Sequence, residues 1–461
     1  MLALTVILPI FGAANVVAAT PAVNAPKVNF GPEHKHWREP YDDVYKKLKM
    51  NLHKKHHIYM AQPAPIYRGV YLWDSAFISQ IWLKANPKIA KDVIRSVLYN
   101  QQIDGRVPHV VSLFGTSPWT QPPLLSWAVK NIFEKTGDLA FVAEVYPALV
   151  RYHEWLRRER RGPEGLYFWL HPYESGLDNS PRFSDRAEKH FNDTTKQRAV
   201  DLTAYAIMDA DALAALAEVR KAAVEATNAP QANAPTNAPT DVSAEASANV
   251  PAEGAAEVAV EAPAERDAAS EYRREASETR ELMQKYMWNE QDGQFYDYLA
   301  DKKTQLKVHT WVTFLALTAG VATPEQAPKL IAHLTNPKEY ATEIPFATVQ
   351  RNSAEFQKDC WRGPVWINTA YLMILGLERY NDHRAARDLA ERLVDGVFRT
   401  WQIEHTFYEY YDPDAPTLKN LTRKEGNFFK QITLGSKPVS DFVGWTGLVN
   451  NLVVDYGLGQ N

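Results

Sequence analysis

The amino-acid sequence predicts an all-α protein. Apolar residues recur three and four positions apart in one segment after another, which is the spacing of amphipathic helices. Alternating strand patterns are scarce, and residues 167–170 and 294–298 are the candidates for short strands. The chain has 461 residues, 45% hydrophobic and 23% charged, the composition of an ordinary globular protein. This length allows two domains or one large architecture with a single core.

Prolines, glycines and capping residues indicate where the helices begin and end. Pro87 suits the first position of a helix, Gly137 ends one helix, and Asp138 caps the next. Residues Thr323 to Gln326 combine a capping Thr, a Pro at the first helical position and a Gln three residues after the Thr. The sequence therefore predicts roughly a dozen helices in successive pairs. Predicted helical segments include residues 73–86, 87–98, 141–155, 201–226, 364–380, 383–401 and 442–452, and one beginning at 323–326.

Residues 228–264 interrupt the helical pattern. They are mostly Ala, Pro, Asn, Thr, Glu, Val and Ser, and no aromatic residue occurs between Tyr205 and Tyr272. Such a segment cannot bury enough apolar surface to offset the entropy of ordering it, so we expect disorder. Helix-like sequence flanks the segment on both sides. We therefore expect a long loop within one domain that covers residues 36–461, with catalytic residues on both sides of the loop.

The first 22 residues resemble an export signal or a retained anchor. Leu2 to Ala19 is almost continuously apolar and ends in small residues suited to signal peptidase, although no Lys or Arg precedes the run. The run approaches the length of a membrane-spanning helix, which keeps the anchor as an alternative. We expect a periplasmic or secreted protein, or a cytoplasmic one if this run is not a signal, with no other membrane contact.

Charge and ligand-forming residues exclude several function classes. The formal net charge is −4 and no dense run of Lys and Arg occurs, so no nucleic-acid partner is expected. His53 and His57 have the spacing of a helical metal-ligand pair, but Lys54 and Lys55 lie between them and no Glu does. We therefore expect no metal and no other cofactor. The 13 Trp, 22 Tyr and 18 Phe fit a large core or a cleft whose rings stack on sugars.

Two segments place carboxyl groups in settings suited to glycoside hydrolysis, which needs one protonated and one ionised carboxyl group. In residues 171–183, two prolines and a glycine prevent a continuous helix, so Glu174 and Asp178 project from a structured loop. The alternative is a turn in which Asp caps its own backbone. In residues 404–413, Glu409 lies among aromatic residues that could hold a base in place, or it is a surface carboxylate. Glu404 is a rival base.

These segments belong to a series of blocks that resembles glycoside hydrolase family 63 and its relatives. That group includes processing α-glucosidases and the mannosylglycerate and glucosylglycerate hydrolases, and the trehalases of a neighbouring family are similar at a greater distance. Seven blocks occur in the expected order and span nearly the whole chain apart from the first residues and the low-complexity insert. They are Tyr71–Phe77, Gln101–Pro108, Thr120–Pro123, Glu174–Ser180, Trp361–Asn368, Phe407–Tyr411 and Gly444–Gly447.

The resemblance implies an (α/α)6 toroid with the active site at one open end, and an inverting exo-α-glycosidase acting on a small α-glucoside or α-mannoside. It implies that Asp178 is the general acid and Glu409 the general base. Burial or a neighbouring carboxylate such as Glu174 would keep Asp178 protonated. The implied substrate-binding residues are Trp73, Asp74, Gln121, Trp361, Arg362 and Trp366.

A leaving group that carries a carboxylate, as glycerate does, requires a cation near the acid. The candidates are Arg68, Arg106, Arg182 and Arg186, with Arg182 closest to Asp178 in sequence. The alternative functions are a trehalase-like enzyme, an oligosaccharide α-glucosidase, a sugar epimerase and a sugar-binding protein without catalysis. An epimerase would require a pair of His residues in the cleft, and the nearest to the blocks are His109, His171 and His405.

Overall fold

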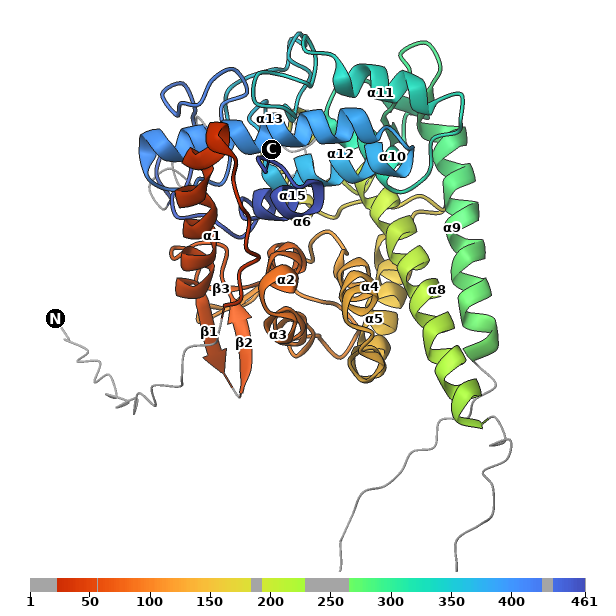
Figure 1. The fold of residues 1–461 in the computed structure, drawn as a ribbon. Coiled ribbons are helices and arrows are strands. Elements are labelled where there is room, and N and C mark those ends of the chain that lie inside the picture. Colours follow the sequence, from red (N-terminus) through yellow and green to blue (C-terminus); the bar gives the residue numbers. More distant parts are fainter. Residues whose placement is uncertain (1–22, 56, 184–192, 229–264, 425–433, 461) are drawn as a thin grey trace, which may run out of the picture.

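The structure is a computed structural model that describes residues 23–55, 57–183, 193–228, 265–424 and 434–460. The predicted signal or anchor at residues 1–22 lies outside the described residues. So does the predicted insert, apart from Asn228 at its start. Figure 1 shows the two long helices that flank this insert, α8 and α9, lying side by side as a hairpin. Among the described residues, no helix has the length and apolar content needed to span a membrane.

An inner set of helices forms a closed ring. Each helix packs against the next one in the series, and the last packs against the first. In ring order they are α2 (Leu72–Ala85), α4 (Leu125–Thr136), α8 (Val200–Asn228), α10 (Leu315–Thr318), α12 (Ile367–Arg379) and α15 (Leu448–Tyr456). Nearly every residue of α2 is buried, because this helix is enclosed on all sides by protein. The strong all-round apolar character of this segment is therefore the signature of an inner helix.

An outer set of helices covers the ring, and outer and inner helices alternate along the chain. In chain order they are α1 (Arg38–Met50), α3 (Pro87–Leu98), α5 (Leu139–Arg160), α9 (Glu265–Met287), α11 (Ala327–Thr335) and α13 (His383–Glu404). α3 packs on α2, α9 packs on α8, and α13 packs on both α12 and α15. This arrangement is an (α/α)6 toroid, so the predicted fold class is confirmed.

Short strands and helical turns occupy the connections between these helices. The strands form small antiparallel sheets in the orders β1–β2, β3–β4–β5, β10–β9–β6 and β7–β8. Their bounds are β1 Leu52–Lys55, β2 Ile58–Ala61, β3 Gly69–Tyr71, β4 Val110–Ser112, β5 Gly115–Thr116, β6 Gln197–Arg198, β7 Trp288–Asn289, β8 Gln294–Phe295, β9 Asp297–Leu299 and β10 Thr304–Leu306. The remaining described helical segments are η1 Pro32–Trp37, α6 Pro172–Ser175, η2 Pro181–Phe183 and η3 Trp311–Phe314.

Most helix boundaries follow the caps in the sequence. The side chain of Asp138 accepts a hydrogen bond of 3.0 Å from the Phe141 N–H at the start of α5, and Gly137 ends α4 with a φ of 65°. The helix predicted to begin at 323–326 begins later, at Ala327. Gln326 Oε1 accepts a 3.0 Å hydrogen bond from the Thr323 N–H, so the predicted capping pair closes a turn in front of the helix.

One end of the toroid carries a cavity, and residues just before the N-termini of four inner helices line it. Tyr71 precedes α2, Gln121 lies shortly before α4, Trp366 precedes α12, and Trp445 lies shortly before α15. All four residues line the same cavity. The sequence predicted a helix over 442–452, but α15 begins at Leu448 because residues 442 and 445 form part of the cavity wall.

Candidate active site

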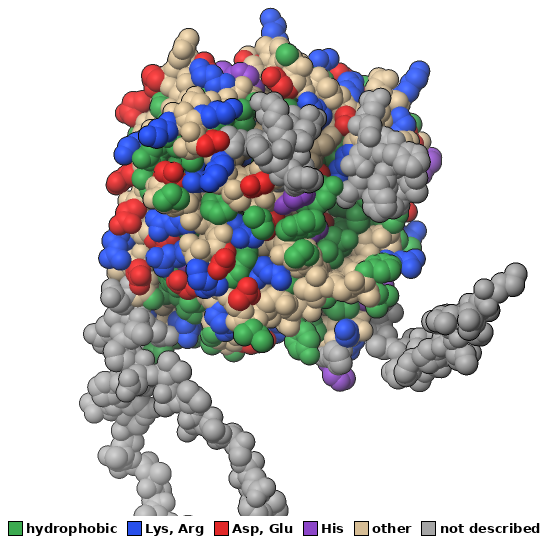
Figure 2. Space-filling view, turned by 180° about the vertical axis from the view of Figure 1, so that it is seen from behind, with side chains coloured by type: hydrophobic (Ala, Val, Ile, Leu, Met, Phe, Trp, Pro, Cys, Tyr) green, Lys and Arg blue, Asp and Glu red, His purple; other side chains and the backbone are tan. Residues whose placement is uncertain are grey.

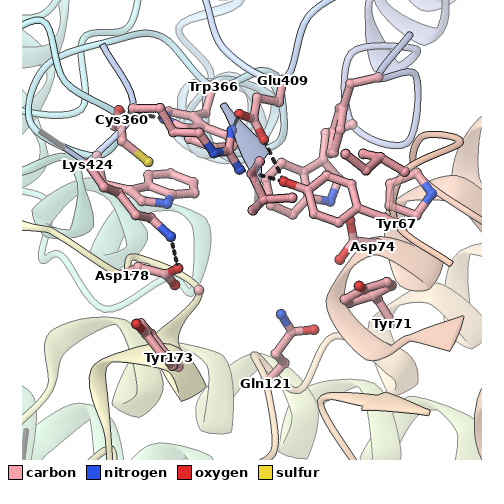
Figure 3. A pocket seen from close by; sticks show the side chains of 18 of the residues that line it. Tyr67, Tyr71, Asp74, Gln121, Tyr173, Asp178, Cys360, Trp366, Glu409 and Lys424 are labelled. Atoms are coloured by element: carbon pink, nitrogen blue, oxygen red, sulfur yellow. Dashed lines mark hydrogen bonds and ion pairs between the residues drawn. The ribbon is translucent and has the colours of Figure 1, made fainter. Parts of the chain in front are cut away.

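A cavity of about 360 Å³ opens at this end of the ring. Asp178 and Glu409 both line it, although the segment 229–264 separates them in sequence. In Figure 3 the two carboxyl groups lie on different parts of the cavity wall. Aromatic side chains, amides and charged groups share this wall, which is the composition of a small-ligand site. Its described lining includes Tyr67, Tyr71, Asp74, His109, Gln121, Tyr173, Asp178, Cys360, Trp361, Trp366, Glu409, Arg423, Lys424, Phe442 and Trp445.

Glu409 is buried and held by donors on both of its oxygens. Its side chain is 2% exposed, and Oε1 accepts a 3.0 Å hydrogen bond from the Val439 N–H. Oε2 accepts a 3.0 Å hydrogen bond from the Tyr67 hydroxyl. The Arg423 guanidinium pairs with Glu409 and also donates to the Tyr67 hydroxyl at 2.6 Å. Hydrogen bonds and a cation of this kind favour the ionised form of a carboxylate, which is the form that a general base requires.

Asp178 is more accessible than Glu409 and has a different partner. Its side chain is 21% exposed and pairs with the ammonium of Lys424, a side chain that is only 8% exposed. The dashed line in Figure 3 marks this contact at the cavity wall. Burial is the largest influence and lowers the pKa of Lys424, but the charge and hydrogen bond of Asp178, together with Cys360, outweigh it, and the pKa is raised. Two consecutive basic residues, Arg423 and Lys424, therefore pair with the two predicted catalytic carboxylates.

Glu174, which the sequence suggested as a charged neighbour of Asp178, is paired with a buried arginine. It is fully buried and accepts two hydrogen bonds from the Arg160 guanidinium, at 2.9 and 2.7 Å. The N–H groups of Leu170 and Thr120 donate to it at 2.9 and 3.3 Å. These contacts to Arg160 and to the backbone anchor the loop that carries Asp178, and Glu174 is not part of the cavity lining.

Asp74 and Gln121 line the cavity as the sequence analysis expected for hydroxyl-binding groups. Asp74 lies in the first turn of α2, and burial raises its pKa to about 7, only partly offset by its backbone hydrogen bond. Near neutral pH this carboxyl group can therefore donate or accept a hydrogen bond. Gln121 Oε1 accepts a 3.1 Å hydrogen bond from the backbone N–H of Trp73, and the amide nitrogen of Gln121 points into the cavity in Figure 3.

Two of the predicted tryptophans line the cavity and one does not. Trp361 and Trp366 stack on each other with ring centroids 3.8 Å apart and planes 5° apart, and both contribute to the wall. Trp73 is fully buried and lies behind the loop at Gly176. A Cβ atom at Gly176 would lie 2.5 Å from the Trp73 ring, so this ring packs against the loop from behind. The prediction that Trp73 offers a platform to the sugar is wrong.

Arg182 was predicted to contact the substrate, and the structure corrects this prediction as well. Its side chain is 2% exposed, and Nη1 donates to both carboxylate oxygens of Asp297 at 3.1 Å. Its other terminal nitrogen pairs with Asp201. These two buried carboxylates, remote in sequence, hold the guanidinium inside the protein, and it does not line the cavity. Arg182 is therefore a structural residue and not a substrate contact.

Arg362 lies beside the main cavity, in an adjoining hollow of about 210 Å³. Tyr173, Asp178 and Lys424 line both spaces, so the predicted acid stands at the boundary between them. Arg362 Nη1 donates to the Asn179 carbonyl at 3.4 Å. The side hollow is lined by polar and charged residues, namely Tyr173, Asp178, Asn179, Gln357, Asp359, Arg362 and Lys424.

Three residues that line the cavity were not predicted from the sequence, namely Tyr67, Arg423 and Lys424. Tyr67 lies four residues before the first recognised block, and Arg423 and Lys424 follow the Glu409 block in an irregular connection. The sequence feature that could have indicated them is the pair of consecutive basic residues, Arg423 and Lys424, that follows the aromatic block around Glu409. Among the described residues, no group of three or more His, Cys, Asp or Glu side chains could hold a metal ion.

Comparisons with known proteins identify the family. The profile of a family described as the mannosylglycerate hydrolase MGH1-like glycoside hydrolase domain matches residues 67–429, on both sides of the insert. A mannosylglycerate hydrolase of Rubrobacter radiotolerans is 26% identical over 392 residues, which cover 76% of this chain and 87% of that protein. A mannosylglycerate hydrolase of Thermus thermophilus is 27% identical over 393 residues, covering 76% and 89%.

Solved structures support the same fold. The glucose complex of a family 63 mannosylglycerate hydrolase from Thermus thermophilus superposes with a TM-score of 0.66 at 21% identity, covering 89% of this chain and 98% of the other. The neutral trehalase Nth1 of Saccharomyces cerevisiae superposes with a TM-score of 0.61 at 17% identity, covering 90% and 79%. This chain belongs to the mannosylglycerate hydrolase MGH1-like family of glycoside hydrolases and is a glycoside hydrolase.

Proposed function

We propose that this protein is an inverting exo-acting α-glycosidase, with Asp178 as general acid and Glu409 as general base, that hydrolyses a small α-glucoside or α-mannoside. The observation that carries the proposal is the pair of carboxyl groups that line one cavity, with Glu409 held by Tyr67 and Arg423 in the ionised form that a base requires. The two relatives compared by sequence above are mannosylglycerate hydrolases, which favours a glycosylglycerate as the substrate.

In the proposed reaction, the two carboxyl groups act on opposite faces of the anomeric carbon. Glu409 accepts a proton from a water molecule, and the water oxygen forms a bond to the anomeric carbon. The bond from that carbon to the leaving oxygen breaks, and Asp178 gives its proton to that oxygen. The configuration inverts because the water attacks the face opposite the leaving group, which requires carboxyl groups roughly 6.5–9.5 Å apart.

The size and lining of the cavity suit a single sugar ring. At about 360 Å³ it is at the small end of ligand pockets. Asp74 and Gln121 offer hydrogen-bonding groups, while Trp361 and Trp366 offer aromatic carbons. The side hollow beyond Asp178 would receive the leaving group, since the acid must stand next to the oxygen that it protonates.

Lys424 replaces Arg182 as the candidate cation for an anionic leaving group. It lines both the cavity and the side hollow, and its present partner is the acid itself. A carboxylate on the leaving group would compete for the ammonium and leave Asp178 in a setting where it can hold a proton. This exchange would favour substrates such as glucosylglycerate or mannosylglycerate over neutral disaccharides.

Proton NMR of the purified protein with glucosylglycerate, mannosylglycerate, trehalose and short α-glucobioses tests the proposal. We expect hydrolysis of a glycerate glycoside with the β-anomer released first. Early α-anomer would mean retention and would remove the roles given to Asp178 and Glu409. Preferential cleavage of trehalose would favour the trehalase-like alternative.

Two variants test the assigned roles. Asp178→Asn and Glu409→Gln should each lower kcat by at least about 1,000-fold, because each removes a proton transfer that the other carboxylate cannot supply. Glu404→Gln is the matched control and should retain activity within about twofold. Near-normal turnover by either catalytic variant would contradict its assignment. Sugar binding without turnover by the wild-type protein would favour the non-catalytic alternative.

A further inference from the structure

Two neighbouring hairpins beside the active site carry unusual side chains at their tips. β4 and β5 pair Ser112 with Gly115, so the loop between them is Leu113-Phe114. Loops of two residues in hairpins usually contain Asn, Asp or Gly. Here both residues are large and apolar, and they are 95% and 98% exposed. An exposed apolar pair at this position stabilises neither the turn nor the core.

The second hairpin is basic. β1 and β2 pair Lys55 with Ile58 at the end of the hairpin, and the side chains of His53, Lys54 and Lys55 are exposed. Lys54 Nζ lies 5.5 Å from the centroid of the Tyr59 ring on the opposite strand. This hairpin therefore presents positive charge that no carboxylate in the strands β1 and β2 neutralises.

The two hairpins enclose one hollow of about 640 Å³. His53, Lys55 and Met60 line it from the first hairpin, and Val111 and Leu113 line it from the second. Its described lining also includes Met50, Pro65, Arg68 and Val70, and no Asp or Glu. Figure 2 shows hydrophobic side chains gathered on this side of the molecule, above a projecting tip that carries Lys or Arg and His side chains.

We propose that this face docks on the surface of an anionic phospholipid bilayer. Lys54, Lys55 and Arg68 would meet the lipid headgroups, and Leu113 and Phe114 would enter the boundary between headgroups and acyl chains. A soluble polyanion would use the positive charge but not the apolar tip. A second copy of this chain would bring an identical cationic rim against the first, and like charges at close range repel.

Docking in this orientation places the catalytic cavity beside the lipid surface. Ile66 lines the catalytic cavity, and its neighbour Pro65 lines the hollow between the hairpins. The inference does not depend on the substrate or on the predicted signal, because all of its residues lie within the described body of the protein.

The experiment is sedimentation of the full chain with vesicles of phosphatidylcholine alone and with phosphatidylglycerol added. We expect binding to the anionic vesicles that weakens as NaCl is raised. Lys54→Gln with Lys55→Gln should lower the partition coefficient about 25-fold, at about fivefold per lysine. Leu113→Ser with Phe114→Ser should lower it at least about tenfold, because the apolar tip no longer inserts.

Two control variants distinguish vesicle binding by this face from binding by other parts of the surface. Ile403→Ser changes an apolar residue that is 60% exposed on α13, and Lys338→Glu changes an exposed charge elsewhere. Neither should change the binding. All variants keep residues 1–22, so binding that survives both hairpin variants would be due to another segment and would overturn the proposal. Absence of wild-type binding to anionic vesicles, or an equal loss in the controls, would also overturn it.

Discussion

His153 holds three helices together by its charge, so the stability of the fold should fall at alkaline pH. Its Nδ1 lies 2.9 Å from an oxygen of Asp209 on α8, and its Nε2 lies 3.2 Å from an oxygen of Glu275 on α9. The side chain is 1% exposed. Burial lowers the pKa of His153, but hydrogen bonds and charge from the two carboxylates outweigh it, and the pKa is raised from 6.5 to about 9.

The sign and size of the effect follow from this pKa. The folded protein binds the proton more tightly than the unfolded chain, so unfolding becomes easier as the pH rises. The contribution is complete below pH 6.5 and is lost as the pH rises through about 9. A difference of about 2.5 pH units corresponds to about 3 kcal/mol, at 1.36 kcal/mol per unit. For a folded unit of about 400 residues, this free energy corresponds to about 4 °C in the unfolding midpoint.

His153→Gln is the test, because glutamine keeps hydrogen-bonding groups but cannot carry the charge. The variant should be less stable than the wild type at pH 6.5, and the gap between the two unfolding midpoints, followed by circular dichroism, should be about 3 °C smaller at pH 9 than at pH 6.5. Titrating groups remote from His153 contribute equally to both proteins and cancel in the gap. His383→Gln is the control, since His383 is 66% exposed in its pair with Glu378 and such pairs contribute little. A constant gap for His153→Gln from pH 6.5 to 9 would refute the reasoning.

Three further predictions concern the site and the insert. Arg182→Met should lower the unfolding midpoint and kcat, because it leaves two buried carboxylates unpaired at a cost of about 3–5 kcal/mol. KM should stay within about twofold of the wild-type value. A rise in KM alone would restore Arg182 as a substrate contact. Tyr67→Phe should lower kcat/KM by roughly 10- to 100-fold, since Glu409 loses a charged hydrogen bond of about 1.5–3 kcal/mol. An unchanged value would show that Tyr67 does not support the function of Glu409. Replacing residues 229–264 by a short Gly/Ser linker should leave kcat/KM within about twofold, and a collapse of activity would show that the insert is part of the enzyme.

The fold could be predicted because helical periodicity is a local property of the sequence. The segments 73–86, 87–98 and 383–401 lie within a residue or a few residues of α2, α3 and α13. Their arrangement as a ring came from the resemblance, since periodicity does not specify which helices pack together. The late start of α11 shows the limit of local patterns, because Gln326 closes a turn with its side chain and the helix begins after it.

The site could be predicted only where its residues lie in recognised blocks. Asp178 and Glu409 both line the cavity, and their roles remain predictions. Arg182 was chosen because it is four residues from Asp178, but spatial neighbours decide what an arginine binds. Arg182 instead pairs with Asp201 and Asp297, which are 19 and 115 residues away in sequence. Lys424 was missed for the same reason, because its partner Asp178 is 246 residues away.

The corrected role of Arg182 explains how the loop that carries Asp178 is held in place. Glu174, four residues before Asp178, is fixed by the Arg160 guanidinium, and Arg182, four residues after it, is fixed by two buried carboxylates. Buried ion pairs are weak evidence for net stability, because the cost of desolvating the charges offsets their attraction. Their geometric effect is definite, since each charge would be left unpaired if the loop moved. A loop anchored on both sides presents its central carboxyl group with little freedom, and the rate of a positioned proton transfer depends on that restriction. The two anchors therefore support the role proposed for Asp178, even though neither side chain lines the cavity.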